Sequence, residues 1–191
     1  ADLRQHRELI AGARVLLLQM EIPRETVFEA LRLGRECGLT TILNPAPAAP
    51  LPSDLLRLVD ILTPNESEAQ ALTGSADPAE AARILTDRGV GTVVVTCGAN
   101  GAFLATGNDV THIPGFLVET IDSTGAGDAF NGALACAVAE GVPLKSAIER
   151  ANAAGALATT GRGAQELMPT KDDIEQLCRS GIRQLEPPPR S

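Results

Sequence analysis

The sequence predicts an α/β fold in which helices cover both faces of a mainly parallel β-sheet. Short apolar or β-branched segments alternate with segments whose apolar residues recur at helical spacing, along most of the 191 residues. That alternation is typical of βαβ units, whose strands run parallel. Hydrophobic residues make up 44% of the chain, which is enough for one domain with a sizeable core.

The first part of the chain predicts two strands with a helix between them. The apolar run at 14–20 predicts a buried strand, and TTILN at 40–44 predicts a β-branched one. Apolar residues at helical spacing predict a helix that opens at Pro23 and ends at Gly38. The segment 44–52 is rich in proline, so it cannot form regular structure and is predicted to be a loop.

The middle of the chain predicts three helices and one short strand. SDLLRLV at 53–59 reads as a short helix, and DILTP at 60–64 as a strand. An asparagine cap and a closing glycine predict a helix within 65–74. An aspartate cap followed by proline predicts another helix at 77–89.

The last part of the chain holds the clearest strand, TVVVTCG at 92–98. Segments 101–106 and 110–116 predict two antiparallel strands around the turn GND. Helical spacing then predicts three helices, at 126–140, 144–160 and about 171–178.

Composition and charge narrow the possible partners. The net charge of −8 gives no general attraction to nucleic acid or to anionic lipid. Four Phe with no Trp or Tyr argue against binding single strands by base stacking. We therefore expect no nucleic-acid and no membrane partner. A phosphate can still be bound locally, because backbone amides at a helix N-terminus need no net positive charge.

We expect one domain at 1–180, followed by a disordered tail at 181–191. The polar, charged N-terminus is not a secretory signal and no apolar run is long enough to span a membrane, so we expect a cytoplasmic protein. His6 and His112 have no partners at metal spacing and are predicted to be structural or exposed. Without a CxxC, the cysteines are predicted to be free thiols: Cys37, Cys97, Cys136 and Cys178.

Polar or glycine-rich loops follow the predicted strands, where ligands bind in open α/β sheets. They are Glu21, NPAPA, NESE, CGANG and DSTGAGD. STGAGD is neither a Walker loop nor the Rossmann fingerprint. Its Gly125–Gly127 amides, at the start of a helix, suit an anion. Asp128 would repel that anion, but it could instead remove a proton from a hydroxyl. The alternative is an ordinary acid in the first turn of a helix.

Two further acidic sites allow two interpretations each. Asn65 and Glu68 in NESE form an ordinary helix cap, or they organise Mg²⁺ through water, since Mg²⁺ keeps much of its hydration. Glu21 either begins a loop or accepts hydrogen bonds from a sugar. The charge runs RQHRE and KDD are predicted to be solvated faces.

Six segments together resemble the ribokinase family of sugar kinases, in the order of that family, from residue 14 to about 170. They are LLLQMEIP, LNPAPAAPLP, DILTPNESEAQALTG, VVVTCGANGAF, DSTGAGDAFNGALA and ANAAGALATTGRGAQ. The resemblance implies a three-layer αβα, Rossmann-like fold. It implies that Asp128 is the catalytic base and that Gly125, Ala126 and Gly127 form the anion hole for the γ-phosphate. It also implies that Glu21 binds the sugar.

The same resemblance implies three cofactors: ATP, Mg²⁺ and an activating K⁺. Asn65 and Glu68 match the element associated with phosphate and Mg²⁺. The implied nucleotide contacts are Thr96, Cys97, Gly98, Ala99, Asn100, Gly101 and Asn152. The implied K⁺ ligands are Asp122, Thr124, Ala158, Gly161 and Gly163. Leu167 departs from the pattern, because the family often has a small polar residue there.

The activity implied is ATP-dependent phosphorylation of D-ribose to D-ribose 5-phosphate. Only about twenty residues precede Glu21, so the chain resembles the C-terminal portion of the family, without the N-terminal lid, the first strands and most sugar contacts. Family members are often homodimers. Two alternatives stay open: an inactive nucleotide-binding remnant, and a kinase for another sugar such as deoxyribose.

Overall fold

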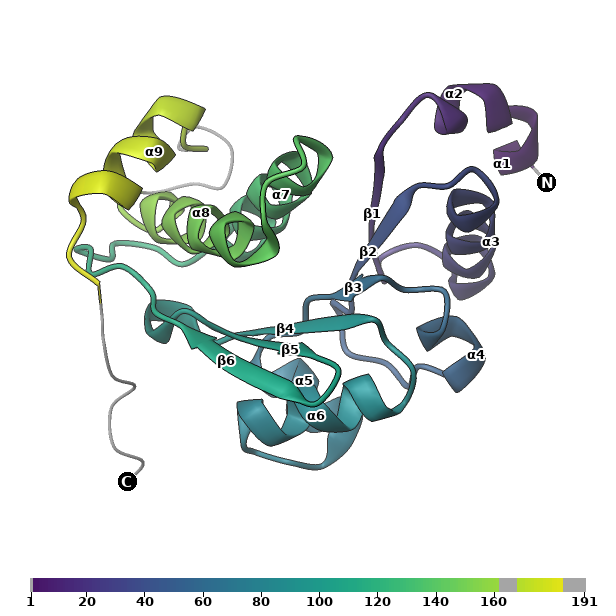
Figure 1. The fold of residues 1–191 in the computed structure, drawn as a ribbon, viewed down its shortest axis with the longest axis horizontal. Coiled ribbons are helices and arrows are strands. Elements are labelled where there is room, and N and C mark those ends of the chain that lie inside the picture. The colour runs from purple at the N-terminus through teal and green to yellow at the C-terminus, as the bar shows by residue number, and fades with distance from the viewer. Residues whose placement is uncertain (1, 162–167, 184–191) are drawn as a thin grey trace. The chain divides into compact units, whose positions relative to one another are not determined.

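The computed structural model describes residues 2–161 and 168–183 (Figure 1). These residues divide into two compact units. The first unit is Ala1–Thr96 with Phe103–Thr111, and the second is Cys97–Ala102 with His112–Ser191. Each unit carries a different group of the residues that the sequence singles out.

The strands form one mixed six-stranded sheet, in the order β1-β2-β3-β4-β5-β6. Strands β1 to β4 are parallel neighbours, and a two-residue turn joins β5 to β6, as in an antiparallel hairpin. The predicted alternation is thereby confirmed. The strands are β1 (Val15–Gln19), β2 (Thr40–Asn44), β3 (Ile61–Leu62), β4 (Thr92–Thr96), β5 (Ala102–Thr106) and β6 (Asp109–Ile113).

The helices of the first unit pack on this sheet. Helix α3 contacts β1 and β2, whereas α5 and α6 contact β4. The caps are as predicted: Asn65 and Glu68 form a capping box, and Asp77 accepts from the amides of Ala79 and Glu80. These helices are α3 (Arg24–Glu36), α4 (Ser53–Leu56), α5 (Glu66–Thr73) and α6 (Pro78–Asp87).

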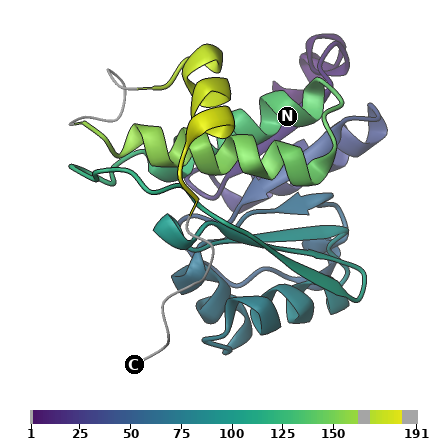
Figure 2. The same cartoon turned by 60° about the vertical axis from the view of Figure 1, so that its left-hand side comes forward.

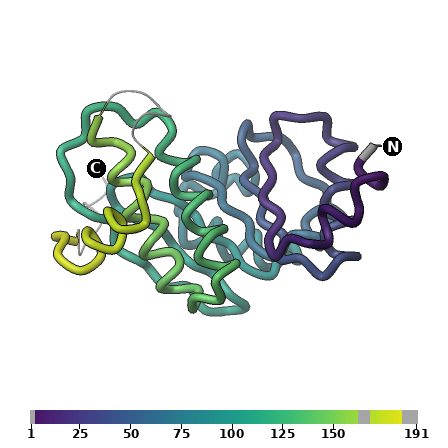
Figure 3. The backbone as a smooth tube through the Cα atoms, turned by 90° about the horizontal axis from the view of Figure 1, so that it is seen from above, coloured from purple at the N-terminus to yellow at the C-terminus, as the bar shows by residue number. Residues whose placement is uncertain are grey.

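The N-terminal charge run RQHRE is exposed, as predicted. It lies across two short helices, α1 (Asp2–Gln5) and α2 (Arg7–Ala11), alongside α3 (Figure 3). Arg4 pairs with Glu29 of α3, and Arg7 donates to Glu36 at 2.7 Å. The hydrogen bond from Arg7 lowers the pKa of the Glu36 carboxyl. Exposed ion pairs join this segment to α3. No local sequence pattern predicts them.

The second unit is built on three helices. Helix α8 packs against α7, and α9 packs on α8 (Figure 2). Small side chains allow this close packing: Ala129, Ala154 and Ala158 form one buried cluster, and a Cβ on Gly155 would come within 3.3 Å of the Ala126 carbonyl. No helix in the described ranges is both long and apolar enough to cross a membrane. The three helices are α7 (Ala126–Ala139), α8 (Leu144–Ala158) and α9 (Lys171–Ser180).

The core is aliphatic, as the shortage of aromatic residues predicts. The first unit buries Leu31, Ile42, Leu62 and Val94, and the second buries Leu134 and others. The four cysteines are free thiols, as predicted. The segment predicted as a disordered tail starts at 181; Ile182 accepts a hydrogen bond from the amide of Leu117, and 184–191 lie outside the described residues.

Replacing either of two helix glycines with alanine is expected to change the free energy of unfolding, in opposite directions at the two positions. Gly34 of α3 faces the sheet, where a Cβ would lie 2.8 Å from Leu16 Cδ2 and 3.2 Å from Thr41 Cγ2. We expect Gly34→Ala to cost about 1–3 kcal/mol of unfolding free energy through overpacking. Gly132 of α7 has open space at the same position, so Gly132→Ala should stabilise by about 0.5–1 kcal/mol. Denaturant unfolding measures both, and effects of the same sign would contradict this packing.

Candidate functional site

The turn that leads into α7 is the centre of the candidate site. Asp122 opens it, because its Oδ1 accepts hydrogen bonds from the amide of Thr124 at 3.0 Å and from its hydroxyl at 2.7 Å. Gly125 then has φ +80°, the left-handed conformation that favours glycine. The helix begins at the next residue. The segment thus folds into a tight turn with little side-chain bulk. The turn leads directly into the N-terminus of a 14-residue helix.

This turn has the properties of an anion-binding site. A left-handed residue followed by helical ones can turn N–H groups toward one concavity, and the helix dipole adds partial positive charge there. In this turn the Ala126 amide also donates to the Ser123 carbonyl at 3.2 Å. Gly127 is exposed, and no atom lies within 4 Å of where its Cβ would be. Packing therefore does not demand a glycine at this position. A ligand could approach the backbone closely there, as a phosphate at an anion hole must.

The end of α8 is tied to the same turn. The carbonyl of Thr159 accepts from the amides of Ile121 at 2.7 Å and Asp122 at 3.2 Å. These bonds bring the backbone of Asp122 beside the end of α8, whose last residue is Ala158. Helix C-termini carry carbonyls without intrahelical donors, and such carbonyls with a carboxylate suit a monovalent cation. Of the other predicted ligands, Gly161 lies three residues after the end of α8, whereas Gly163, like Leu167, lies outside the described residues.

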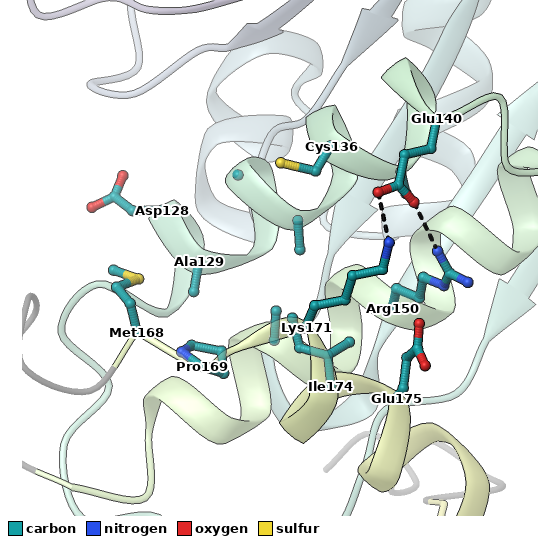
Figure 4. Close-up of a pocket in the computed structure, with 14 residues that line it drawn as sticks. Asp128, Ala129, Cys136, Glu140, Arg150, Met168, Pro169, Lys171, Ile174 and Glu175 are labelled. Atoms are coloured by element: carbon teal, nitrogen blue, oxygen red, sulfur yellow. Dashed lines mark hydrogen bonds and ion pairs between the residues drawn. The ribbon is translucent and has the colours of Figure 1, made fainter.

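Asp128 lies in the first turn of α7 with its side chain exposed. It stands at the edge of a cavity of about 350 Å³ between α7 and α9 (Figure 4). The other end of that cavity holds a cluster of charges, in which Glu140 accepts from Lys171 at 2.7 Å and lies 3.5 Å from Arg150. The helical geometry is compatible with both interpretations of Asp128, so its role as a base stays a prediction.

Residues 97–101 of the loop predicted to contact the nucleotide lie in the second unit, where two glycines allow close backbone packing. Gly101 has φ +87°, and a Cβ there would lie 2.2 Å from the Ile113 carbonyl. A Cβ on Gly115 would likewise lie 2.2 Å from the Ala99 carbonyl. His112, which was assigned no function, donates from Nε2 to the Asn100 carbonyl at 2.7 Å. The exposed Gly98 and Ala99 form the short 3₁₀ turn of this loop.

Asn152 supports the segment that packs on this loop. Its side chain is buried, and Nδ2 donates to the carbonyls of Ile113 and Pro114, each at 3.2 Å. Those are the backbone groups beside Gly101. The structure thus gives Asn152 a structural function, and its contact with adenine stays a prediction.

The remaining predicted residues lie in the first unit. The capping box of α5 joins the Glu68 amide to Asn65 Oδ1 at 2.8 Å, and the Asn65 amide to Glu68 Oε2 at 2.9 Å. No other side-chain hydrogen bond is formed by Asn65 or Glu68 within the described part of the chain. One amide nitrogen and one carboxylate oxygen therefore remain to meet a ligand while the cap persists. The cap and the Mg²⁺ interpretation are compatible.

Two other predicted residues occupy the carboxyl edge of the sheet. Glu21 is exposed, two residues after β1 ends. Thr96 ends β4, and its amide donates to the Pro64 carbonyl at 2.9 Å, next to Asn65. Within the described ranges, no group of three or more His, Cys, Asp or Glu side chains could enclose a metal ion. A single carboxylate fits Mg²⁺, which is commonly held by one or two carboxylates, waters and substrate phosphates.

Comparison with known proteins identifies the family. The model for the pfkB family carbohydrate kinases matches residues 3–171. The chain belongs to this family. Its similarity extends to solved structures: a ribokinase from Arabidopsis thaliana, complexed with ribose and ATP, superposes with a TM-score of 0.84 at 30% identity, over 92% of this chain and 59% of that one. The ribokinase-like α/β fold is therefore confirmed.

Two curated relatives show the range of the pfkB family around this chain. A ribokinase of Haemophilus influenzae is 40% identical over 175 residues, which are 89% of this chain and 57% of the relative. A deoxyribokinase of Salmonella typhi is 33% identical over 181 residues, which are 92% of this chain and 59% of the relative. The chain thus spans less than two thirds of the length of these pfkB-family relatives.

The sequence interpretation missed three residues that support the site. They are Gln19, Asn44 and His112, whose side chains bind backbone or one another around the predicted loops. Only Asn44 carried a signal, since a polar residue ended an apolar strand directly before a proline.

The nucleotide loop yields a prediction at Gly101. At Gly101 a side chain would be strained by the positive φ, and its Cβ would lie 2.2 Å from the Ile113 carbonyl oxygen. Gly101→Ala must therefore displace the loop from Ile113. We expect amide hydrogen exchange at 98–101 to accelerate at least about tenfold, because such strain costs about 1–3 kcal/mol. Gly98→Ala is the matched control, since Gly98 also has a positive φ but open space around it. Equal acceleration of exchange in both variants would show that the positive φ, and not the contact with Ile113, requires glycine at position 101.

The charge cluster predicts a pH dependence for the docking of α9. The bond from Lys171 lowers the pKa of Glu140 below its ordinary 4.5, and the same pair raises the pKa of Lys171 above 10.5. The stabilisation of α9 docking by ionised Glu140 is therefore fully present above pH 4.5, the ordinary pKa. It is lost as the pH falls through the lowered pKa that Glu140 has in the folded protein. We expect exchange protection of α9 amides to fall in that acidic range.

Lys171→Met should remove most of this acid sensitivity. Arg179→Met, which breaks the exposed pair between Arg179 and Glu175 inside α9, should retain it. The opposite ranking of the two variants would contradict the assignment.

Proposed function

We propose that this chain carries the phosphoryl-transfer residues of an ATP-dependent sugar kinase that converts D-ribose to D-ribose 5-phosphate. The observation that supports this best is the start of α7, where a left-handed glycine and an exposed glycine precede a carboxylate at Asp128. Membership of the pfkB family supports it independently.

The chemistry assigned to this turn divides charge stabilisation from proton transfer. The amides of Gly125, Ala126 and Gly127 hold the γ-phosphoryl group and stabilise the negative charge that develops on its oxygens. Asp128 accepts the proton of the attacking sugar hydroxyl. An acid directly behind an anion hole is unfavourable for phosphate alone, but it is well placed for a hydroxyl that attacks that phosphate.

ATP and Mg²⁺ are assigned to the residues whose polar atoms remain available. The 98–101 loop offers exposed backbone to the nucleotide, with Thr96 before it. Asn65 Nδ2 and Glu68 Oε1 would meet phosphate oxygens and the hydration shell of Mg²⁺. Mg²⁺, when bound, neutralises charge on the phosphates. Asp122, Thr124 and the end of α8 would hold K⁺ close to the anion hole.

The sugar is the least constrained part of the proposal. Glu21 would accept hydrogen bonds from sugar hydroxyls, and the relatives include both a ribokinase and a deoxyribokinase. A panel of D-ribose and 2-deoxy-D-ribose in a coupled ADP assay distinguishes them. A second candidate is a nucleotide-binding module without transfer, which the exposed backbone of Gly98 and Ala99 supports.

Asp128→Asn tests the assigned base. It keeps the shape of the side chain but removes the proton acceptor, so we expect ADP formation with D-ribose to fall by about 10²–10⁴-fold while the Kd for an ATP analogue changes little. Asp172→Asn is the control, because Asp172 is also an exposed acid in the first turn of a helix. Equal turnover in both variants would support the ordinary helix-terminal acid.

Calorimetry on the unmodified chain separates the two functions. ADP formation with sugar supports the kinase. Binding of an ATP analogue without any turnover supports the nucleotide-binding module, and absence of nucleotide binding would refute both.

A further inference from the structure

The carboxyl edge of the sheet has a break in its hydrogen-bond ladder beside the predicted Mg²⁺ residues. Strands β2 and β3 are parallel, with Leu43 paired to Leu62, and the Thr63 amide extends the ladder by donating to the Leu43 carbonyl at 2.9 Å. In a regular parallel ladder the Thr63 carbonyl would accept from the amide at position 45. Position 45 is Pro45, which has no N–H.

The side chain of Asn44 replaces the missing donor. Its Nδ2 donates to the Thr63 carbonyl at 2.8 Å. Its Oδ1 accepts from Gln19 Nε2 at 3.1 Å, and Gln19 is its partner in the ladder on the other side. Asn44 and Thr63 are both buried, at 8% and 1% exposure. Losing a hydrogen bond to a carbonyl at this depth would be costly, so the carboxamide stabilises the backbone where it lies.

The segment that Asn44 holds leads directly to the capping box. Pro64 and Asn65 follow Thr63, and the Pro64 carbonyl accepts from the Thr96 amide at 2.9 Å. The backbone from Thr63 to Asn65 is thus held from β2 by a side chain and from β4 by an amide. The direction of this backbone determines where the side-chain atoms Asn65 Nδ2 and Glu68 Oε1 of the capping box lie.

We propose that Asn44 is a positioning residue, whose carboxamide substitutes for the amide hydrogen that Pro45 lacks and so orients the Asn65–Glu68 pair toward Mg²⁺ and phosphate. The consequence for nucleotide binding rests on the proposed function. The consequence for the backbone at 63–68 does not. The two can be measured separately.

Asn44→Leu is the test, because leucine has a similar size but neither a donor nor an acceptor. Thr41→Val is the matched control at the other end of β2, where the buried Thr41 hydroxyl donates to the Leu58 carbonyl at 2.7 Å. Each variant removes the side-chain hydrogen bonds of one β2 residue: Thr41 Oγ1 bonds Leu58 and Asp60, and the Asn44 carboxamide bonds Thr63 and Gln19. Only Asn44→Leu removes them at the edge that carries the predicted site.

The first measurement is amide hydrogen exchange without ligand. Asn44→Leu should reduce protection at the Asn65 and Glu68 amides about tenfold or more, since it removes a bond of about 1.4 kcal/mol or more, and Thr41→Val should not. Pro45→Ala in the Asn44→Leu background restores an N–H at the regular ladder position and should recover part of the protection. Unchanged protection at 65–68 in Asn44→Leu would overturn the proposal.

The second measurement is the affinity for an ATP analogue with and without Mg²⁺. The gain in affinity on adding Mg²⁺ should fall about tenfold in Asn44→Leu, as is usual when the support of a metal ligand is removed, and should persist in Thr41→Val. If the unmodified chain binds no nucleotide, the proposed function fails while the exchange result still stands. If it binds and both variants keep the full Mg²⁺ gain, the positioning role is wrong.

Discussion

The structure of this protein depends on one constraint: backbone N–H and C=O groups without a regular partner must find another one. Parallel strands end with carbonyls and amides that still need partners, and a helix begins with amides that have none within the helix. The first unit meets the need at β2 and β3 with the Asn44 carboxamide. At the start of α7 in the second unit, a tight glycine turn leads into helix amides that are proposed to bind an anion. The same physical requirement yields support in one place and a candidate binding site in the other.

The candidate residues have structural roles beside the chemical ones proposed for them. Asn65 and Glu68 are a capping box and still keep polar atoms for a ligand. Asp122 closes a turn through Thr124 and is also tied to the end of α8 through the Thr159 carbonyl. A cap or a turn therefore does not argue against a binding role. It preorganises the group, so that little conformational entropy is lost on binding.

Local patterns predicted the strands, the caps and the glycine turn, because each depends on residues a few positions apart. The sequence interpretation missed α1 and α2, whose arginines pair with α3 residues 25 and 29 positions away. It also missed that the expected strand at 110–116 ends at Ile113, where Gly115 must instead pack against the 98–101 loop. His112 carried no local signal at all, since its partner, the Asn100 carbonyl, is a backbone atom. Long-range contacts with backbone leave no pattern in a single sequence.

The central claim is that phosphate meets the backbone at the start of α7. Titration of the ¹⁵N-labelled chain with a non-hydrolysable ATP analogue and Mg²⁺ tests it most directly, because each amide reports for itself. The account predicts that the largest shifts occur at the amides of Gly125 and Gly127, accompanied by those of the 98–101 loop. Saturable binding that leaves the Gly125 and Gly127 amides unmoved would contradict it.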